Sequence, residues 1–291
     1  MLNMIRHFLL CILVGLTTFG PALSAQRPEP PAKTPAGVAV PAGKWETLRT
    51  AEVDIHYQLP SESDARLYAG FFESAHRRIR SEFSGFDVDA LARRPARCGV
   101  WLHPTPGDAV SAGGALNASS AGPAAYCELH FLTPAAYTEK DRCCTKVGEV
   151  RDVDQMNRIA VHEYVTIVLD RITRQRSGWQ YHSAPKWFEQ GYEEYLACMI
   201  ASEHTRTVTL SKYRDLLAGT PSRLRDNGDV ENPYIEGTVV VEYLHAELGR
   251  QKVQAILTNP SKTFDEAFRA TLGFDQRELF ERVRTKVGSS R

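Results

Sequence analysis

The chain has 291 residues, of which 43% are hydrophobic and 24% charged, a composition that excludes collagen-like, low-complexity and disordered proteins. Lysine plus arginine equals aspartate plus glutamate at 35 each, so the charge balance argues against a protein that binds nucleic acid or an anionic membrane surface. The length suits one large domain or two small ones, with enough chain to bury a core.

The first 25 residues have the pattern of a secretory signal peptide. Arg6 and His7 provide a short basic start, residues 8–16 form an apolar run, and small residues end the segment at Ala25. The apolar run is too short to span a bilayer core of about 30 Å. We therefore expect a secreted or periplasmic protein, cleaved after about residue 25, with no membrane span in the mature chain.

Export changes the interpretation of the cysteines. Five remain in the mature chain: Cys98, Cys127, Cys143, Cys144 and Cys198. An oxidising compartment favours two disulfides and one free thiol, but the pairing does not follow from the sequence. No C-x-x-C pair is present, which disfavours a zinc ribbon or a thioredoxin-type redox site.

A Pro- and Ala-rich tether is expected over residues 26–43, followed by one domain over residues 44–291. The first part of this domain, about 44–150, is predicted to be sheet-rich. Apolar residues alternate along 53–59, 98–102 and 127–131, which predicts three strands.

Between these strands the sequence predicts one helix and one loop. The helix is expected to begin at Ser61, and its core-facing stripe consists of Leu67, Phe71, Ala75 and Ile79 at four-residue spacing. Residues 106–125 are rich in Gly, Ala and Ser and predict a long flexible loop.

The second part of the domain, about 151–291, is predicted to be helical. Helices are expected over 152–172, 183–200 and 233–248, with Ser183 as the N-cap of the second. Two short closing helices are marked by capping boxes, Thr263 with Glu266 and Asp275 with Glu278. Strands followed by helices predict an α+β fold.

The segment over residues 159–169 reads IAVHEYVTIVL and places two ionisable residues, His162 and Glu163, in an apolar helix. Burying such groups is costly unless they are paired or used. In zinc peptidases with an H-E-x-x-H helix, two histidines at i and i+4 bind zinc and the glutamate is the general base for the zinc-bound water. Here the fifth position is Thr166. Taken alone, the His162-Glu163 dipeptide is better explained as a buried hydrogen-bonded pair than as part of a metal site.

A second segment, residues 184–197, reads APKWFEQGYEEYLA. Together the two segments resemble the peptidase-MA-like domains, a gluzincin branch of the zinc metallopeptidases, in which a helix beginning near W-[LF]-x-E-G-x-A-E-Y follows H-E-x-x-H. The match consists of Pro185, Trp187, Phe188, Gly191, Glu194 and Tyr195, and the resemblance covers roughly residues 53–287. It implies a zincin-like fold, in which a small mixed sheet packs on the helix of His162 and a helical half follows, with a cleft between them.

The resemblance breaks at the zinc ligands. It places His162 at the first ligand position and Glu163 at the general-base position, but Thr166 and Gln190 stand where the family has a histidine and a glutamate ligand. A hydroxyl and an amide are poor zinc ligands, so zinc is a possible but doubtful cofactor. The family comparison assigns Glu194 to orienting His162, and Glu194 is also a weak candidate for a replacement ligand.

Other side chains are weaker candidates. His182, His204 and His245 are more simply explained as surface or core histidines than as ligands. Tyr192 and Tyr234 could bind a ligand at the mouth of the cleft, but core packing is the simpler interpretation.

Three hypotheses follow. The leading one is an exported gluzincin-fold protein, catalytically inactive, that binds a peptide or a protein partner; the resemblance implies that the strand over 127–131 forms the edge that pairs with an extended peptide. The first alternative is an active zinc peptidase with an unusual ligand set, such as His162, Glu194 and one further His or Glu. The second is a structural envelope protein that keeps only the fold, with His162 and Glu163 as an internal pair.

Overall fold

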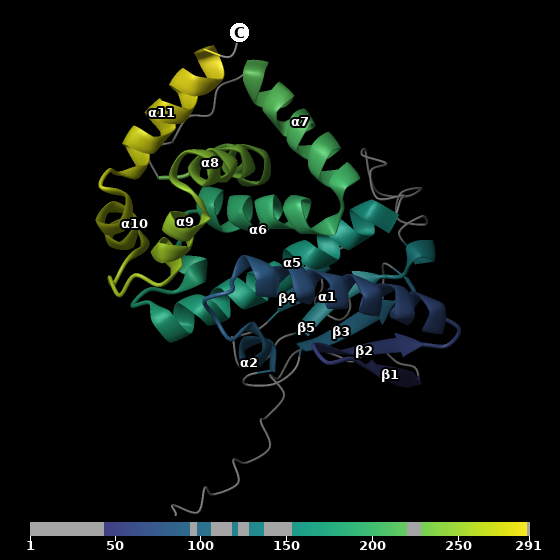
Figure 1. Ribbon diagram of the computed structural model, residues 1–291. Helices are drawn as coiled ribbons and strands as arrows, with labels where there is room; N and C mark the ends of the chain where they lie inside the picture. The colour runs from purple at the N-terminus through teal and green to yellow at the C-terminus, as the bar shows by residue number, and fades with distance from the viewer. Residues whose placement is uncertain are drawn as a thin grey trace, which may run out of the picture. The chain divides into compact units, whose positions relative to one another are not determined.

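A computed structural model describes residues 44–93, 98–105, 118–121, 128–136, 153–219 and 228–289 (Figure 1). The α+β class is confirmed, because a mixed sheet is followed by a mostly helical remainder. The predicted signal peptide and tether lie outside the described residues, as do Cys127, Cys143 and Cys144. Within those ranges no helix is both long and apolar enough to cross a membrane.

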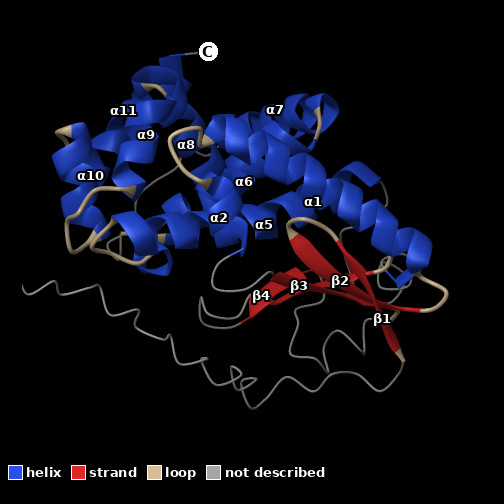
Figure 2. Ribbon diagram, turned by 60° about the horizontal axis from the view of Figure 1, so that its bottom comes forward, coloured by secondary structure: helices blue, strands red, loops and turns tan. Residues whose placement is uncertain are grey.

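Within the described residues, five strands form one sheet in the order β1-β2-β3-β5-β4. The strands are β1 (Trp45–Arg49), β2 (Val53–Gln58), β3 (Cys98–His103), β4 (Ala118–Ala121) and β5 (Glu128–Leu132). The three central strands β2, β3 and β5 are parallel, whereas β1 and β4 run antiparallel at the two ends of the sheet. The helices lie on one side of this sheet (Figure 2).

The structure corrects two predictions about the sheet. The strand predicted over residues 127–131 corresponds to β5, but β5 is not an edge, since β3 pairs on one side of it and β4 on the other. The edge beyond β5 is formed by β4, which lies inside the segment predicted to be a loop, and β1 forms the opposite edge. Its sequence ASSA carries no alternating pattern or β-branched residue, so pairing with β5, and not local preference, makes it a strand.

Two helices belong to the sheet-rich part. Helix α1 (Glu62–Glu82) begins after Ser61 as predicted, and Phe71, Ala75 and Ile79 are buried while Leu67 is half-buried. The side chain of Ser61 makes no capping hydrogen bond. Helix α2 (Val88–Arg93) was not predicted, and Arg171 donates hydrogen bonds to the carbonyl oxygens of Leu91 and Ala92 in it.

Helices α5 (Val153–Arg176) and α6 (Lys186–Ala201) carry the two motif segments, joined by a short 3-10 helix η1 (Tyr181–Ser183). The prediction that Ser183 caps α6 is wrong, because Ser183 lies in η1 and its hydroxyl donates to the carbonyl of Gln180. The cap is supplied by Asp229, whose carboxylate accepts hydrogen bonds of 3.0 Å from the backbone N–H groups of Lys186 and Trp187. A distant residue thus fixes the start of α6.

The remaining helices are α7 (Glu203–Gly219), α8 (Pro233–Leu248), α9 (Arg250–Leu257), α10 (Phe264–Leu272) and α11 (Gln276–Ser289). Helix α8 has the predicted bounds. Both capping boxes are confirmed in the hydrogen bond that the N-cap side chain accepts. The backbone N–H of Glu266 donates to the side chain of Thr263, and the backbone N–H of Glu278 donates to the side chain of Asp275. Helices α7 and α9 were not predicted.

Glycine at position 191 allows α6 and α8 to cross at very short distance. A Cβ atom built on Gly191 would lie 2.3 Å from the carbonyl carbon of Gly237, and one on Gly237 would lie 2.2 Å from the carbonyl oxygen of Trp187. No side chain larger than hydrogen fits at either position without moving a backbone. This contact gives Gly191 of the motif a packing role and holds α6 in place beside α5.

One of the two described cysteines is in a disulfide. Cys98 in β3 is disulfide-bonded, to a partner outside the described residues, whereas Cys198 in α6 is a free and buried thiol. The expected mixture of disulfides and a free thiol thus holds for these two residues.

Candidate functional site

Helices α5 and α6 pack against each other and carry all the site residues expected from the sequence. His162, Glu163 and Thr166 lie on α5, and Gln190 and Glu194 lie on α6. The structure brings His162, Thr166, Gln190 and Glu194 into one buried polar seam between the two helices, together with Glu193, which the sequence analysis did not single out.

His162 is buried, and each nitrogen of its ring faces a carboxylate. Nδ1 lies 3.2 Å from Oε2 of Glu194, and Nε2 lies 3.3 Å from Oε2 of Glu193. Burial disfavours a charged imidazole, but hydrogen bonds to these two carboxylates more than offset that cost and raise the pKa of His162 to about 10. The ring is therefore an imidazolium at neutral pH, and it stacks on Tyr234 at a centroid distance of 5.7 Å.

Glu194 is held as a carboxylate by three neighbours. Burial alone would raise its pKa, yet the charges of Arg158 and His162 and a 2.9 Å hydrogen bond from the Tyr213 hydroxyl lower it to about 2. Arg158 forms an ion pair with the same oxygen, Oε1, and the thiol of Cys198 lies 3.8 Å from it. Glu194 thus contacts His162 and fixes the orientation of its ring, while its other oxygen is committed to Arg158 and Tyr213.

Glu193 is the site residue that the sequence analysis missed. Its side chain is fully buried, and Oε2 faces His162 while accepting a 2.9 Å hydrogen bond from the amide of Gln190. Burial raises the pKa of Glu193, with His162 and Thr166 acting in the opposite direction. Its second oxygen, Oε1, has no hydrogen-bond partner among the described residues. The available signal was the family pattern itself, which has alanine at this position.

Thr166 and Gln190, the two neutral side chains of the seam, both make hydrogen bonds within the protein. The hydroxyl of Thr166 donates a 3.1 Å hydrogen bond to the carbonyl oxygen of His162, one turn earlier in α5. The side-chain amide of Gln190 donates a hydrogen bond to the carboxylate of Glu193. Glu163 is half-buried and makes no hydrogen bond or ion pair within the described part of the chain; burial raises the pKa of its carboxyl, with the charge of His162 opposing.

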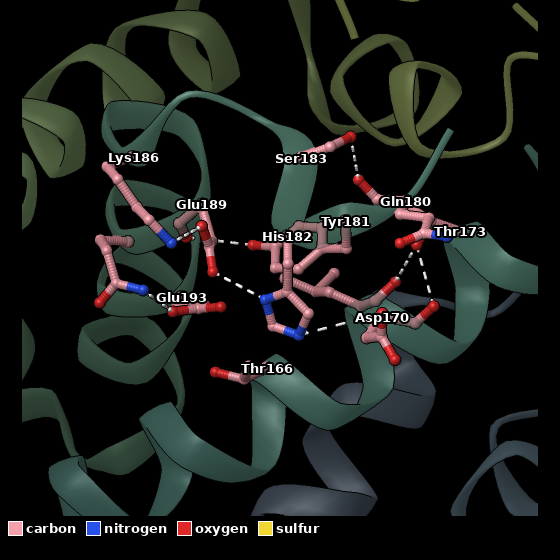
Figure 3. Close-up of polar contacts among 12 residues, drawn as sticks. Thr166, Asp170, Thr173, Gln180, Tyr181, His182, Ser183, Lys186, Glu189 and Glu193 are labelled. Carbon is pink, nitrogen blue, oxygen red and sulfur yellow. Dashed lines mark hydrogen bonds and ion pairs between the residues drawn. The ribbon is translucent and has the colours of Figure 1, made fainter. Parts of the chain in front are cut away.

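A second polar group, centred on His182, lies next to the seam (Figure 3). Its residues on α5 and α6 are one helical turn away from Thr166 and Glu193. Nδ1 of His182 lies 2.8 Å from Oε1 of Glu189, and Nε2 lies 3.9 Å from Oδ1 of Asp170. Lys186 also pairs with Glu189. The hydrogen bond to Glu189 raises the pKa of His182 although burial opposes it. His182 therefore bridges α5 and α6.

The other expected histidines do not join the seam. The side chain of His204 lies outside the described part of the molecule. His245 lies on α8, where its ring packs against Tyr195 with centroids 4.7 Å apart and burial lowers its pKa to about 4. Among the described residues, no group of three His, Cys, Asp or Glu side chains is placed to hold a metal ion.

The comparisons with known proteins add no family. No family model matches the chain, and no curated protein matches it.

Proposed function

We propose that this protein is an exported, peptidase-like protein that holds no catalytic zinc and binds an extended peptide or protein segment without cutting it. The single observation that carries the proposal is the buried pair between His162 and Glu193. The pair engages His162, the residue that the resemblance to the zinc peptidases places at the first ligand position.

The chemistry of the donor set supports a site without metal. A histidine binds zinc through the lone pair of a neutral ring, whereas both ring nitrogens of His162 face carboxylates that raise its pKa to about 10, so zinc would have to displace a proton from the ring. Thr166 and Gln190 supply a hydroxyl and an amide, neither of which is a usual zinc ligand. Here Glu193 neutralises the imidazolium and Gln190 binds the same carboxylate. The four residues form a consistent hydrogen-bonded set, so no step of hydrolysis is assigned to them.

Peptide binding is supported by the edge of the sheet. Strand β4 lies at one edge of the sheet and packs against α5, the helix that carries His162 and Glu163. An extended peptide adds to such an edge through backbone hydrogen bonds, so the proposed binding surface consists of β4 and the neighbouring part of α5. The disulfide of Cys98 supports an oxidising compartment, in agreement with the predicted signal peptide.

The test is the zinc content of the mature chain, starting near Gln26 and purified without a His-tag. We expect far less than one zinc per chain after dialysis against trace zinc, and no chelator-sensitive cleavage of unfolded casein. Close to one zinc per chain, with cleavage that EDTA and Glu163→Gln both abolish, would overturn the proposal. That outcome would favour an active peptidase with an unusual ligand set, and His162→Ala should then remove both the metal and the activity.

A further inference from the structure

A cavity of about 600 Å³ lies between α6, α7 and α8, away from the residues that form the polar seam. Its volume falls within the range of small-molecule binding sites, about 300–1,000 Å³. We call it the α7 cavity, because one face of α7 supplies much of its wall. Arg206, Leu210 and Arg214 line it at four-residue intervals, which places them on one side of that helix.

The floor of the α7 cavity is apolar and uncharged. Leu210 and Tyr195 are buried, and Met199 packs against the core. The ring of His245 lies against Tyr195 and is neutral at physiological pH, since burial lowers its pKa to about 4. A ligand reaching this floor therefore meets aliphatic and aromatic surface.

The rim of the cavity is cationic. Three arginines, Arg206, Arg214 and Arg250, line it with side chains that are 39%, 55% and 45% exposed, so their head groups are within reach of solvent and of a ligand. Glu242 also lines the cavity, but two nitrogens of Arg214 already bind its carboxylate. All three arginines are paired with a carboxylate, but Arg214 binds Glu242 through two nitrogens, whereas Arg206 and Arg250 each make a single contact, with Glu203 and Glu82.

The guanidinium groups of Arg206 and Arg250 have unused donors. Arg206 gives one N–H to Glu203, and Arg250 gives one to Glu82, in the hydrogen bonds made within the described residues. A guanidinium carries five N–H donors in a planar fork that suits a carboxylate. Each of these two arginines can therefore bind an additional anion without giving up its present partner.

We propose that the α7 cavity binds a small amphipathic anion, a molecule with one carboxylate and an apolar tail. The carboxylate lies at Arg206 and Arg250, and the tail lies on Tyr195 and Leu210. An apolar floor with arginines at its rim selects such a ligand over a neutral or cationic molecule with the same tail, because a carboxylate accepts charge-assisted hydrogen bonds from the unused guanidinium donors. This inference is independent of peptide binding at β4 and of zinc at His162.

The test is calorimetric titration of the mature chain with three probes that share a ten-carbon tail, all below the concentration at which they form micelles. The probes are decanoate, decanol and decyltrimethylammonium. We expect decanoate to bind once per chain, decanol more weakly, and the cation not at all. Equal binding of the three probes would show that the rim plays no part and would overturn the proposal.

Two variants locate the site. Ala246→Trp places a large side chain at an exposed position of the cavity wall and should abolish decanoate binding. Arg206→Gln with Arg250→Gln should weaken decanoate by about tenfold and leave decanol unchanged. The matched control, Arg66→Gln with Arg282→Gln, removes two arginines from exposed same-helix ion pairs elsewhere and should bind like the wild type. Unchanged decanoate binding in folded Ala246→Trp would place the site elsewhere.

Discussion

Nε2 of His162 on α5 and Oε2 of Glu193 on α6 lie 3.3 Å apart in the buried seam between the two helices. Glu193 lies on α6, one turn after Gln190, and its carboxylate meets the imidazole across the interface with α5. Glu193 and Glu194 together raise the pKa of His162 to about 10, although burial opposes them, so the ring carries a positive charge at neutral pH that the two carboxylates balance.

The pair should contribute measurably to stability. Glu193→Ala removes one partner of a buried ion pair and leaves the imidazolium with Glu194 only, so we expect the free energy of unfolding to fall by about 3 kcal/mol in urea titrations. The matched control is Glu62→Ala, which removes an exposed pair with Arg66 and should cost less than about 1 kcal/mol. Equal effects of the two substitutions would contradict the assigned pair.

Stability should depend on alkaline pH through His162. Its folded-state pKa, about 10, is raised above the ordinary value of 6.5. A raised histidine pKa stabilises the fold fully below the unfolded value, and that contribution is lost as the pH rises through about 10. The free energy of unfolding should therefore decline from neutral pH to about pH 10 in the wild type, and the decline should be smaller in His162→Gln. If the free energy of unfolding of the wild type and of His162→Gln fell equally with pH, His162 would not be charged in the folded protein.

Placing the ligand residues of the zinc peptidase pattern on α5 and α6 should create a zinc site. The triple variant Thr166→His, Gln190→Glu and Glu193→Ala supplies two further ligands and removes the competing carboxylate, so we expect close to one zinc per chain by elemental analysis. The control adds His162→Ala to the triple variant and should lose the metal. A folded triple variant that binds no zinc would show that the backbones of α5 and α6 are not spaced as in a zinc peptidase.

The crossing of α6 and α8 predicts opposite effects for two glycine substitutions. Gly191→Ala forces a methyl group into the backbone of Gly237 and should destabilise the protein by about 1–3 kcal/mol or more. Gly70→Ala lies in α1 with open space around its Cβ position and should stabilise by about 0.4–1 kcal/mol. Thermal melts of both variants provide the comparison. A neutral Gly191→Ala would mean that the two helices can separate without cost.

Peptide binding at the sheet edge predicts a difference between neighbouring positions of β4. Backbone N–H groups of an edge strand alternate between the paired strand and solvent, so one of Ser119 and Ser120 directs its N–H away from β5. Proline at the outward position should abolish binding of fluorescent unfolded casein with little change in melting temperature, whereas proline at the inward position should lower the melting temperature. Casein binding that survives proline at both positions would exclude this edge.

Local sequence patterns were sufficient for much of the fold. The bounds of α8 and the caps at Thr263 and Asp275 follow from interactions that span three or four residues, which a sequence displays directly. The same patterns indicated that His162 and Glu163 needed an explanation, because ionisable groups in an apolar helix are costly.

Tertiary structure decided which residues meet. The cap of α6 comes from Asp229, β4 is a strand only because β5 pairs with it, and the partner of His162 at Nε2 is Glu193 and not Glu163. The cap of α6 and the pair of His162 and Glu193 join segments that are far apart in the chain, and β4 needs β5 as a partner because its own sequence does not favour a strand. The sequence by itself determined two helices and placed His162 and Glu163 among apolar residues of the first. Packing of α6 between α5 and α8, permitted by Gly191, decided which carboxylates reach the imidazole.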